Sequence, residues 1–187
     1  MRQIIVTEFM TLDGVVDSPG GDDGHPHAGW TFRDVAFDPA AYELKGREQE
    51  EATAMLLGRV SYGLFAPVWG SMDEFAGYNA MPRYVVSATL AEADPAWPAT
   101  ILRSLDDVAA LRAGEGGPII VHGSSRLVQG LAAAGLVDRY HLLVFPLVLG
   151  SGRRLFAPDD DAYARLELLE QEAYPNGIVK LVYDVRR

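Results

Sequence analysis

The sequence predicts an α/β fold built on a mostly parallel sheet, because four apolar runs typical of buried strands are each followed by a segment with glycine or hydroxyl side chains. Small residues there let backbone N–H groups approach a phosphate, and a following helix adds its positive end. The turn signal Pro175-Asn-Gly177 lies between two more strand-like segments and indicates a C-terminal antiparallel hairpin. The runs and their segments are Ile4–Val6 with 12–14, Ala54–Leu57 with 57–63, Tyr84–Val86 with 86–90 and Pro118–Val121 with 122–127.

Further elements follow from local signals along the chain. Ser104 is a good helix N-cap, and Gly135 closes a helix. Residues 17–39 are rich in Gly, Asp, Pro and His and predict a long loop, and the aromatic stretch 66–82 is expected to be irregular. Strands are predicted at 3–9, 54–57, 83–87, 100–103, 117–121, 139–145, 165–173 and 178–185, and helices at 40–53, from Ser61 to Phe65, after Ser104 and at 124–134.

The composition is globular, since 49% of the 187 residues are hydrophobic and 22% are charged, and we expect one domain over residues 1–187. The net charge of −10 argues against binding to nucleic acids or to anionic membranes. The absence of cysteine excludes disulfides, thiolate nucleophiles and cysteine-ligated metals. Neither a targeting segment nor a membrane-spanning apolar stretch is recognised, so a cytoplasmic protein is expected.

Some polar residues allow two interpretations. Asp13, at the end of the first strand, is either a turn residue bonded to its own backbone or an active-site carboxylate that organises a proton. The segment 150–154 could clamp an anion, but a surface loop is preferred, and the acidic run 159–161 is expected to be a solvated turn.

The histidines are also ambiguous. The segment 22–27 contains two aspartates and two histidines that could ligate a metal, but a solvated loop is preferred and no metal site is predicted. His122 and His141 lie in strand-like runs, so we expect core or edge histidines whose rings bond backbone groups.

Together these segments resemble the dihydrofolate reductase-like superfamily, and most closely the branch that contains the reductase domain of the riboflavin-biosynthesis deaminase-reductase and its stand-alone bacterial relatives. The resemblance covers nearly the whole chain and rests on the order and spacing of the motifs. It implies a three-layer fold, with helices on both faces of a twisted sheet and NADPH lying across the strand ends. The motifs are Thr11–Gly14, Leu56–Tyr62, Trp69, Pro82–Ser87, Gly123–Leu127, Gly135–Asp138 and Pro146–Phe156.

The resemblance also implies roles for individual residues. Glu8 and Phe9 would offer backbone groups to the carboxamide of the nicotinamide, and Val16 would pack on its ring. Ser87 matches the turn around the adenosine 2′-phosphate. The residues that match the phosphate-binding turns are Gly58, Arg59, Ser61, Gly123, Ser124, Ser125, Arg126 and Leu127.

Aromatic residues in the loop regions either cover the sheet or line a slot for a flat heterocycle beside the nicotinamide. Trp30, Phe65 and Trp69 are the candidates for substrate binding. The wider set from which they come is Trp30, Phe32, Phe65, Trp69, Phe75 and Tyr78.

Two features of the resembled enzymes are not matched. Dihydrofolate reductases place a proton-donating carboxylate on the first long helix, and none of Asp34, Asp38, Glu43 and Glu48 falls into that motif. The segment with which the riboflavin enzyme holds its ribose phosphate is not found either.

We therefore expect an NADPH-dependent reductase of a small nitrogen heterocycle, resembling 5-amino-6-(5-phosphoribosylamino)uracil reductase or dihydrofolate reductase. The alternative is an NADPH-binding sensor or non-catalytic domain of the same fold. The apolar run 140–149 and the hairpin suggest a homodimer.

Overall fold

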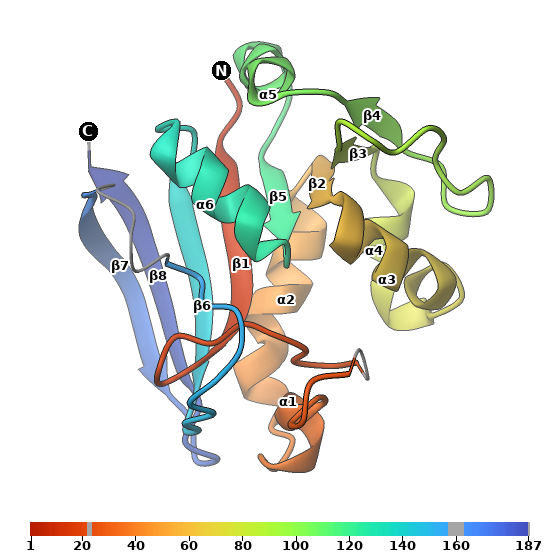
Figure 1. Ribbon diagram of the computed structural model, residues 1–187. Coiled ribbons are helices and arrows are strands. Elements are labelled where there is room, and N and C mark those ends of the chain that lie inside the picture. Colours follow the sequence, from red (N-terminus) through yellow and green to blue (C-terminus); the bar gives the residue numbers. More distant parts are fainter. Residues whose placement is uncertain (22–23, 157–162, 187) are drawn as a thin grey trace.

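The computed structural model describes residues 1–21, 24–156 and 163–186, which form an eight-stranded sheet with helices on both faces (Figure 1). The sheet order is β4-β3-β2-β5-β1-β6-β8-β7. Neighbouring strands from β4 to β6 are parallel, whereas β8 is antiparallel to both β6 and β7. The strands are β1 (Ile4–Thr11), β2 (Ala54–Gly58), β3 (Arg83–Val86), β4 (Thr100–Leu102), β5 (Ile119–His122), β6 (Arg139–Phe145), β7 (Arg165–Ala173) and β8 (Val179–Arg186). The helices are α1 (Trp30–Arg33), α2 (Pro39–Glu51), α3 (Arg59–Trp69), the 3-10 helix η1 (Asp73–Phe75), α4 (Ala76–Ala80), α5 (Leu105–Ala113) and α6 (Ser125–Ala133).

The central strands bury apolar side chains on both faces of the sheet, because successive residues of a strand point to opposite sides. On β1, Ile4 and Val6 pack with helices α5 and α6, whereas Ile5 packs with α3 and α4. A third group of buried residues joins α1 and α2 to β6 and β8. Figure 1 shows α6 in front of the sheet and α2 behind it. This three-layer arrangement confirms the predicted fold class.

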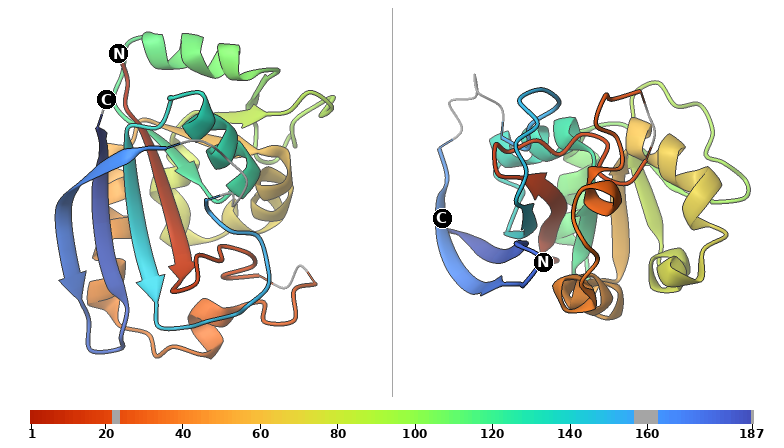
Figure 2. Two further views of the ribbon diagram at one scale, coloured as in Figure 1. Left: turned by 60° about the vertical axis from the view of Figure 1, so that its left-hand side comes forward. Right: turned by 90° about the horizontal axis from the view of Figure 1, so that it is seen from below.

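Local capping and turn chemistry sets several boundaries as predicted. The side-chain Oγ of Ser104 accepts a hydrogen bond from the backbone N–H of Asp107, and the Asp107 carboxylate accepts one from the N–H of Ser104 at 3.1 Å. Gly135 follows α6 with a φ of +66°. Gly177 closes the hairpin turn with a φ of +85°, and Figure 2 shows that hairpin at one edge of the sheet.

The stretch 66–82 is largely helical, so the expectation of an irregular segment is wrong. Helix α3 begins two residues before Ser61 and continues to Trp69, and η1 and α4 follow it. The rings of Phe65 and Phe75 both stack on Trp69, with centroid distances of 4.2 Å. The aromatic side chains are thus the packing surface between short helices.

The apolar run 140–149 is mostly core, so of the two features that suggested a homodimer only the C-terminal hairpin remains. Its first part is β6, an interior strand between β1 and β8, and four of its large side chains are buried. They are Tyr140, Leu142, Leu143 and Phe145.

Among the residues described here, no helix is both long and apolar enough to span a bilayer.

Candidate active site

The carboxyl ends of β2 and β5 lie side by side, and their two turns are joined by a hydrogen bond. The backbone N–H of Gly58 donates to the side-chain Oγ of Ser124 at 2.8 Å. Gly123 and Ser124 are both left-handed, with φ values of +62° and +70°. A Cβ on Gly123 would lie 3.3 Å from the Oγ of Ser61, and one on Gly58 would lie 3.3 Å from the Oγ of Ser124. The turns are therefore too closely packed for larger residues.

Helices α3 and α6 begin at this junction, and neither has a side-chain cap. Their first N–H groups and the positive ends of their dipoles therefore lie at the same edge of the sheet. Arg59 and Arg126 are exposed in the first turns and add two cations, whereas the side chains of Ser125 and Leu127 are buried. Such an edge suits a ligand with more than one phosphate.

Ser87 lies in the next turn of the same edge, after β3. Its Oγ accepts hydrogen bonds from the backbone N–H groups of Thr89 and Leu90, at 3.2 and 2.9 Å. The guanidinium of Arg103, just after β4, donates to the carbonyls of Ser87 and Leu90. Arg103 therefore places a cation at this turn. Sequence reasoning missed it, although its position after a predicted strand was a usable signal.

The end of β1 sends Glu8 and Phe9 to opposite faces of the sheet. Glu8 is 2% exposed, and its Oε1 has no hydrogen-bond partner among the described residues. Burial raises the pKa of the Glu8 carboxyl to about 8, so it is protonated at neutral pH. Val16 is buried in the core that α6 covers, whereas Phe9 packs beside α2, with its ring edge-on to Tyr42 at a centroid distance of 5.7 Å.

The Asp13 carboxylate is bonded to the chain around it. Its Oδ1 accepts from the hydroxyl of Thr11 at 2.6 Å, and its Oδ2 accepts from the backbone N–H of Gly150 at 2.9 Å. The Thr11 hydrogen bond is the main reason why the pKa of Asp13 lies below its usual range. These contacts match the turn interpretation and join the β1 turn to the loop 146–154.

Of the three aromatic candidates, Phe65 and Trp69 lie in one stacked group and Trp30 lies elsewhere. The ring of His122, at the end of β5, is edge-on to Trp69 at a centroid distance of 4.9 Å and to Phe65 at 5.9 Å. Phe65 is half-buried and Trp69 is nearly buried. Trp30 is fully buried against Phe145, and its Nε1 donates to the carbonyl of Asp17. Trp30 has no exposed surface for a substrate, so its assignment to the pocket is wrong.

A buried polar cluster around Glu48 lies between α2 and the sheet. The Glu48 carboxylate accepts from the hydroxyl of Thr7 at 2.7 Å and from the hydroxyl of Tyr78 at 3.1 Å, and it lies 2.9 Å from the Nδ1 of His141. The Nζ of Lys45 lies 3.4 Å from Glu48 and also donates to the Thr7 hydroxyl. Burial alone would raise the pKa of Glu48, but Lys45 and His141 outweigh it and lower the pKa to about 2.

The histidines of this region differ from the expectation that they bond backbone groups. His141 is buried and its Nδ1 is paired with a carboxylate. His122 packs among aromatic rings, and burial lowers its pKa to about 3, so its ring is neutral. The missed signal was Glu48 itself, because it continues the buried stripe that Ala41 and Leu44 form on α2.

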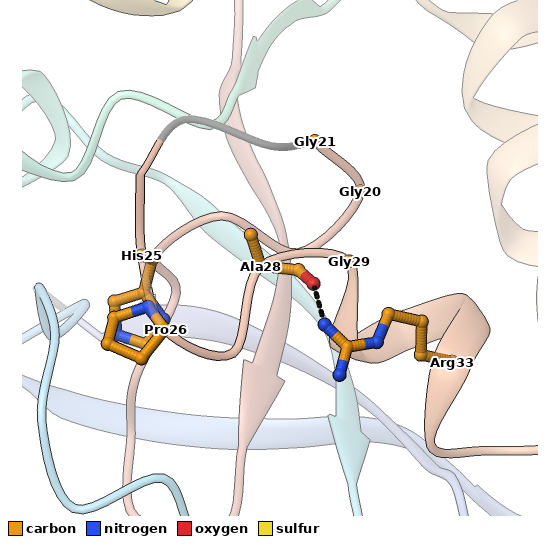
Figure 3. Close-up of a pocket in the computed structure, with 7 residues that line it drawn as sticks. All are labelled: Gly20, Gly21, His25, Pro26, Ala28, Gly29 and Arg33. Carbon is orange, nitrogen blue, oxygen red and sulfur yellow. Dashed lines mark hydrogen bonds between the residues drawn. The ribbon is translucent and has the colours of Figure 1, made fainter.

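Two surface hollows are described, and neither is lined by residues of the Gly58 and Gly123 turns. One, of about 390 Å³, is formed by the glycine-rich loop around residues 20–33, where Arg33 donates to the carbonyl of Ala28 at 2.9 Å (Figure 3). His25 lies against the carbonyl of Ser151 at 3.3 Å. The part of the chain that is described contains no group of three or more potential metal ligands. Asp22, Asp23 and the acidic run 159–161 lie outside it.

Comparisons with known proteins agree with this architecture. The chain is 24% identical over 189 residues to the uncharacterized protein YyaP of Bacillus subtilis, covering 97% of this chain and 94% of that protein. A putative riboflavin biosynthesis protein of Shewanella sp. PV-4 superposes with a TM-score of 0.80 at 19% identity and covers 99% of both chains. Dihydrofolate reductase of Enterococcus faecalis, complexed with NADP(H), gives a TM-score of 0.64 at 14% identity, over 99% of this chain and 97% of that one. The family model of the RibD C-terminal domain matches residues 2–180, and the chain therefore belongs to the RibD C-terminal domain family, with a dihydrofolate reductase-like fold.

Proposed function

We propose that this protein is an NADPH-dependent reductase that transfers a hydride to a small nitrogen heterocycle. The observation that carries the proposal is the junction of the Gly58 and Gly123 turns, where two helices without side-chain caps begin at the carboxyl edge of a parallel sheet. Ligands of open α/β sheets bind at this edge, and two helix N-termini favour the charges of a pyrophosphate. The family match and the NADP(H) complex of a structural relative support the same class of reaction.

The residues present fit the cofactor in two respects. A Cβ at Gly123 would meet Ser61 and Phe65 within 3.4 Å, so the glycine lets this turn lie against the start of α3 and keeps the two helix N-termini together for the phosphates. The Glu8 carboxyl is buried with an unpartnered oxygen, and its protonated form can both donate to and accept from a carboxamide. Bound NADPH would supply the hydride.

We assign three tasks to the chain. Arg59, Ser61, Ser124 and Arg126 hold the phosphates together with the helix N-termini. Ser87 and Arg103 form the 2′-phosphate site. The end of β1, with Val16, positions the nicotinamide. The rings of Phe65, Trp69 and His122, on the face of the sheet that α2 covers, receive the heterocycle and exclude water. We further propose that the protein acts in the cytoplasm as a homodimer, without a nucleic-acid or membrane partner.

Cofactor titrations test this proposal directly. The fluorescence of the three tryptophans is measured while NADPH or NADH is added, and NADPH is expected to bind at least about tenfold more tightly. Gly123→Ala is expected to weaken NADPH binding about tenfold or more. Gly135→Ala is the matched control, because Gly135 has a similar φ of +66° but lies at the other end of α6. Equal affinities for the two cofactors would refute the 2′-phosphate site, and equal effects of the two substitutions would refute the phosphate site.

A further inference from the structure

Lys45 lies at the edge of the Glu48 cluster and above an aromatic ring. Its Nζ is 5.0 Å from the ring centroid of Phe9, and its side chain is 12% exposed. The Phe9 ring is edge-on to His122 at 6.5 Å, and His122 is edge-on to the ring of Trp69. A cation that reaches solvent therefore lies on the α2 face of the sheet, beside the aromatic group that would receive a flat heterocycle.

The ammonium group of Lys45 has one donor to spare. A lysine ammonium carries three N–H donors, and Lys45 directs two of them to the Thr7 hydroxyl and to the Glu48 carboxylate. No other acceptor for Lys45 is found in the described part of the chain. The third N–H is therefore available to an acceptor atom of a ligand.

Lys45 is a counter-ion of Glu48, but this role does not use the whole ammonium group. Glu48 already has three closer partners, at 2.7, 2.9 and 3.1 Å from Thr7, His141 and Tyr78. Lys45 lies farther from the carboxylate, at 3.4 Å. The cluster thus holds the carboxylate by hydrogen bonds, and the carboxylate in turn restrains the ammonium.

We propose that Lys45 binds the acceptor nitrogen of the heterocycle and protonates it, and that Glu48 is a positioning residue that acts through Lys45. The inference rests on the proposed function, which supplies the hydride. The carbon of the substrate C=N bond gains the hydride, the π electron pair moves onto nitrogen, and a new N–H bond forms with a proton from Nζ. The Lys45 amine then takes a proton from water, so that charge and atoms balance.

The same charges indicate the substrate class. The charge of Lys45 is balanced by Glu48, and the neighbouring rings of Phe9, His122 and Trp69 carry no charge at neutral pH. A site with balanced charge surrounded by rings favours a neutral, flat heterocycle with an unprotonated ring nitrogen.

The chain contains only two lysines, which makes the test specific. The protein is produced with lysine that is ¹³C-labelled at Cε, so that Lys45 and Lys180 give two NMR signals. Lys180 is the internal control, because it pairs with Glu172 at 2.9 Å and Glu170 at 3.6 Å on the hairpin. On addition of pterin we expect the Lys45 signal to shift in the full-length protein and the Lys180 signal to stay in place.

Two variants complete the experiment. Lys45→Met is expected to lower pterin affinity about tenfold or more and the turnover of dihydropterin about a hundredfold, with NADPH affinity unchanged. Lys180→Met should change none of these values. In Glu48→Gln, the NMR signal of Lys45 should shift in the ligand-free protein. Turnover should also fall, because kcat is lower.

The proposal is overturned if pterin and a panel of aminopyrimidines all leave the Lys45 signal unshifted, or if Lys45→Met keeps the wild-type turnover. Failure of the proposed function is read separately, as the absence of NADPH binding in the wild type.

Discussion

Replacement of Glu8 by glutamine tests the energetic consequence of the buried carboxyl group on β1. Burial raises the pKa of Glu8 to about 8, with Lys45 opposing this shift and Glu48 adding to it. The ordinary value of 4.5 applies to the unfolded chain. Between these two values the folded state binds one more proton than the unfolded state. The free energy of unfolding therefore falls as the pH rises from 4.5 to 8, and this contribution is constant above pH 8.

The size of the effect follows from the width of that window. Each pH unit changes the free energy of unfolding by about 1.4 kcal/mol, so Glu8 costs at most about 5 kcal/mol at pH 8. His122 opposes this trend at lower pH, because its pKa falls from 6.5 to about 3 on folding and stability rises with pH over that interval. Glu48 matters only at still lower pH. Its pKa is about 2 in the folded protein, so its contribution to the free energy of unfolding is lost as the pH falls below 4.5. The net loss of stability is thus expected between pH 6.5 and 8 and amounts to about 2 kcal/mol.

Urea unfolding of the wild type and of Glu8→Gln at pH 5, 6.5 and 8 measures this quantity. Glutamine has nearly the same shape as the protonated acid and does not titrate, so the two proteins should be similarly stable at pH 5. Relative to the wild type, the free energy of unfolding of the variant should increase by up to about 4 kcal/mol between pH 5 and pH 8. Parallel pH profiles for the two proteins would show that Glu8 is not a protonated, buried acid and would refute the reasoning.

Further predictions concern the turns, one ion pair and the assembly. Asp13→Asn should lower stability by about 1 kcal/mol in thermal unfolding and change turnover less than about threefold, because its carboxylate bonds the local chain; a hundredfold loss would restore its catalytic role. Asp138→Ala should cost about 3 kcal/mol in urea unfolding, because it removes both hydrogen bonds from the partly buried Arg112; a loss below about 1 kcal/mol would contradict this. Arg103→Ala should reduce the preference for NADPH over NADH about tenfold in titrations, and an unchanged ratio would remove Arg103 from the 2′-phosphate site. Sedimentation at micromolar concentration should show twice the 20.3 kDa chain mass, and a monomer would refute the homodimer.

Most strands were predictable from the sequence because the information for a buried parallel strand is local. The runs at 4–6, 54–57, 84–86 and 118–121 are apolar without interruption, and the signal at 175–177 marks the hairpin. The helices within 66–82 were not predictable in this way. Phe65 and Trp69 are neighbours on α3, but the stacking of Phe75 on Trp69 joins η1 to α3 and forms only when the chain has turned between them.

The same distinction, between features set by local sequence and features set by the tertiary fold, applies to the candidate site. The Gly58 and Gly123 turns were predicted at the carboxyl ends of parallel strands, and the structure adds that a hydrogen bond joins them. The pairing of Glu48 with His141 spans 93 residues of sequence and exists only once β6 has paired with β1 and α2 has packed on their face. An acidic residue on the buried stripe of a helix predicts a polar partner but does not identify it.

The position of β8 in the sheet has a consequence for the order in which the chain can fold. In sequence β8 follows β7, yet in the sheet it lies between β6 and β7, and β7 pairs with no other strand of the described residues. Until residues 179–186 have left the ribosome, β6 therefore has one open edge and β7 has no neighbour. Residues 179–186 are needed to close both gaps at once, so the sheet is completed in a single late step. Until then the open edge of β6 can pair with other nascent chains, which makes the speed of this last step important for the yield of native protein.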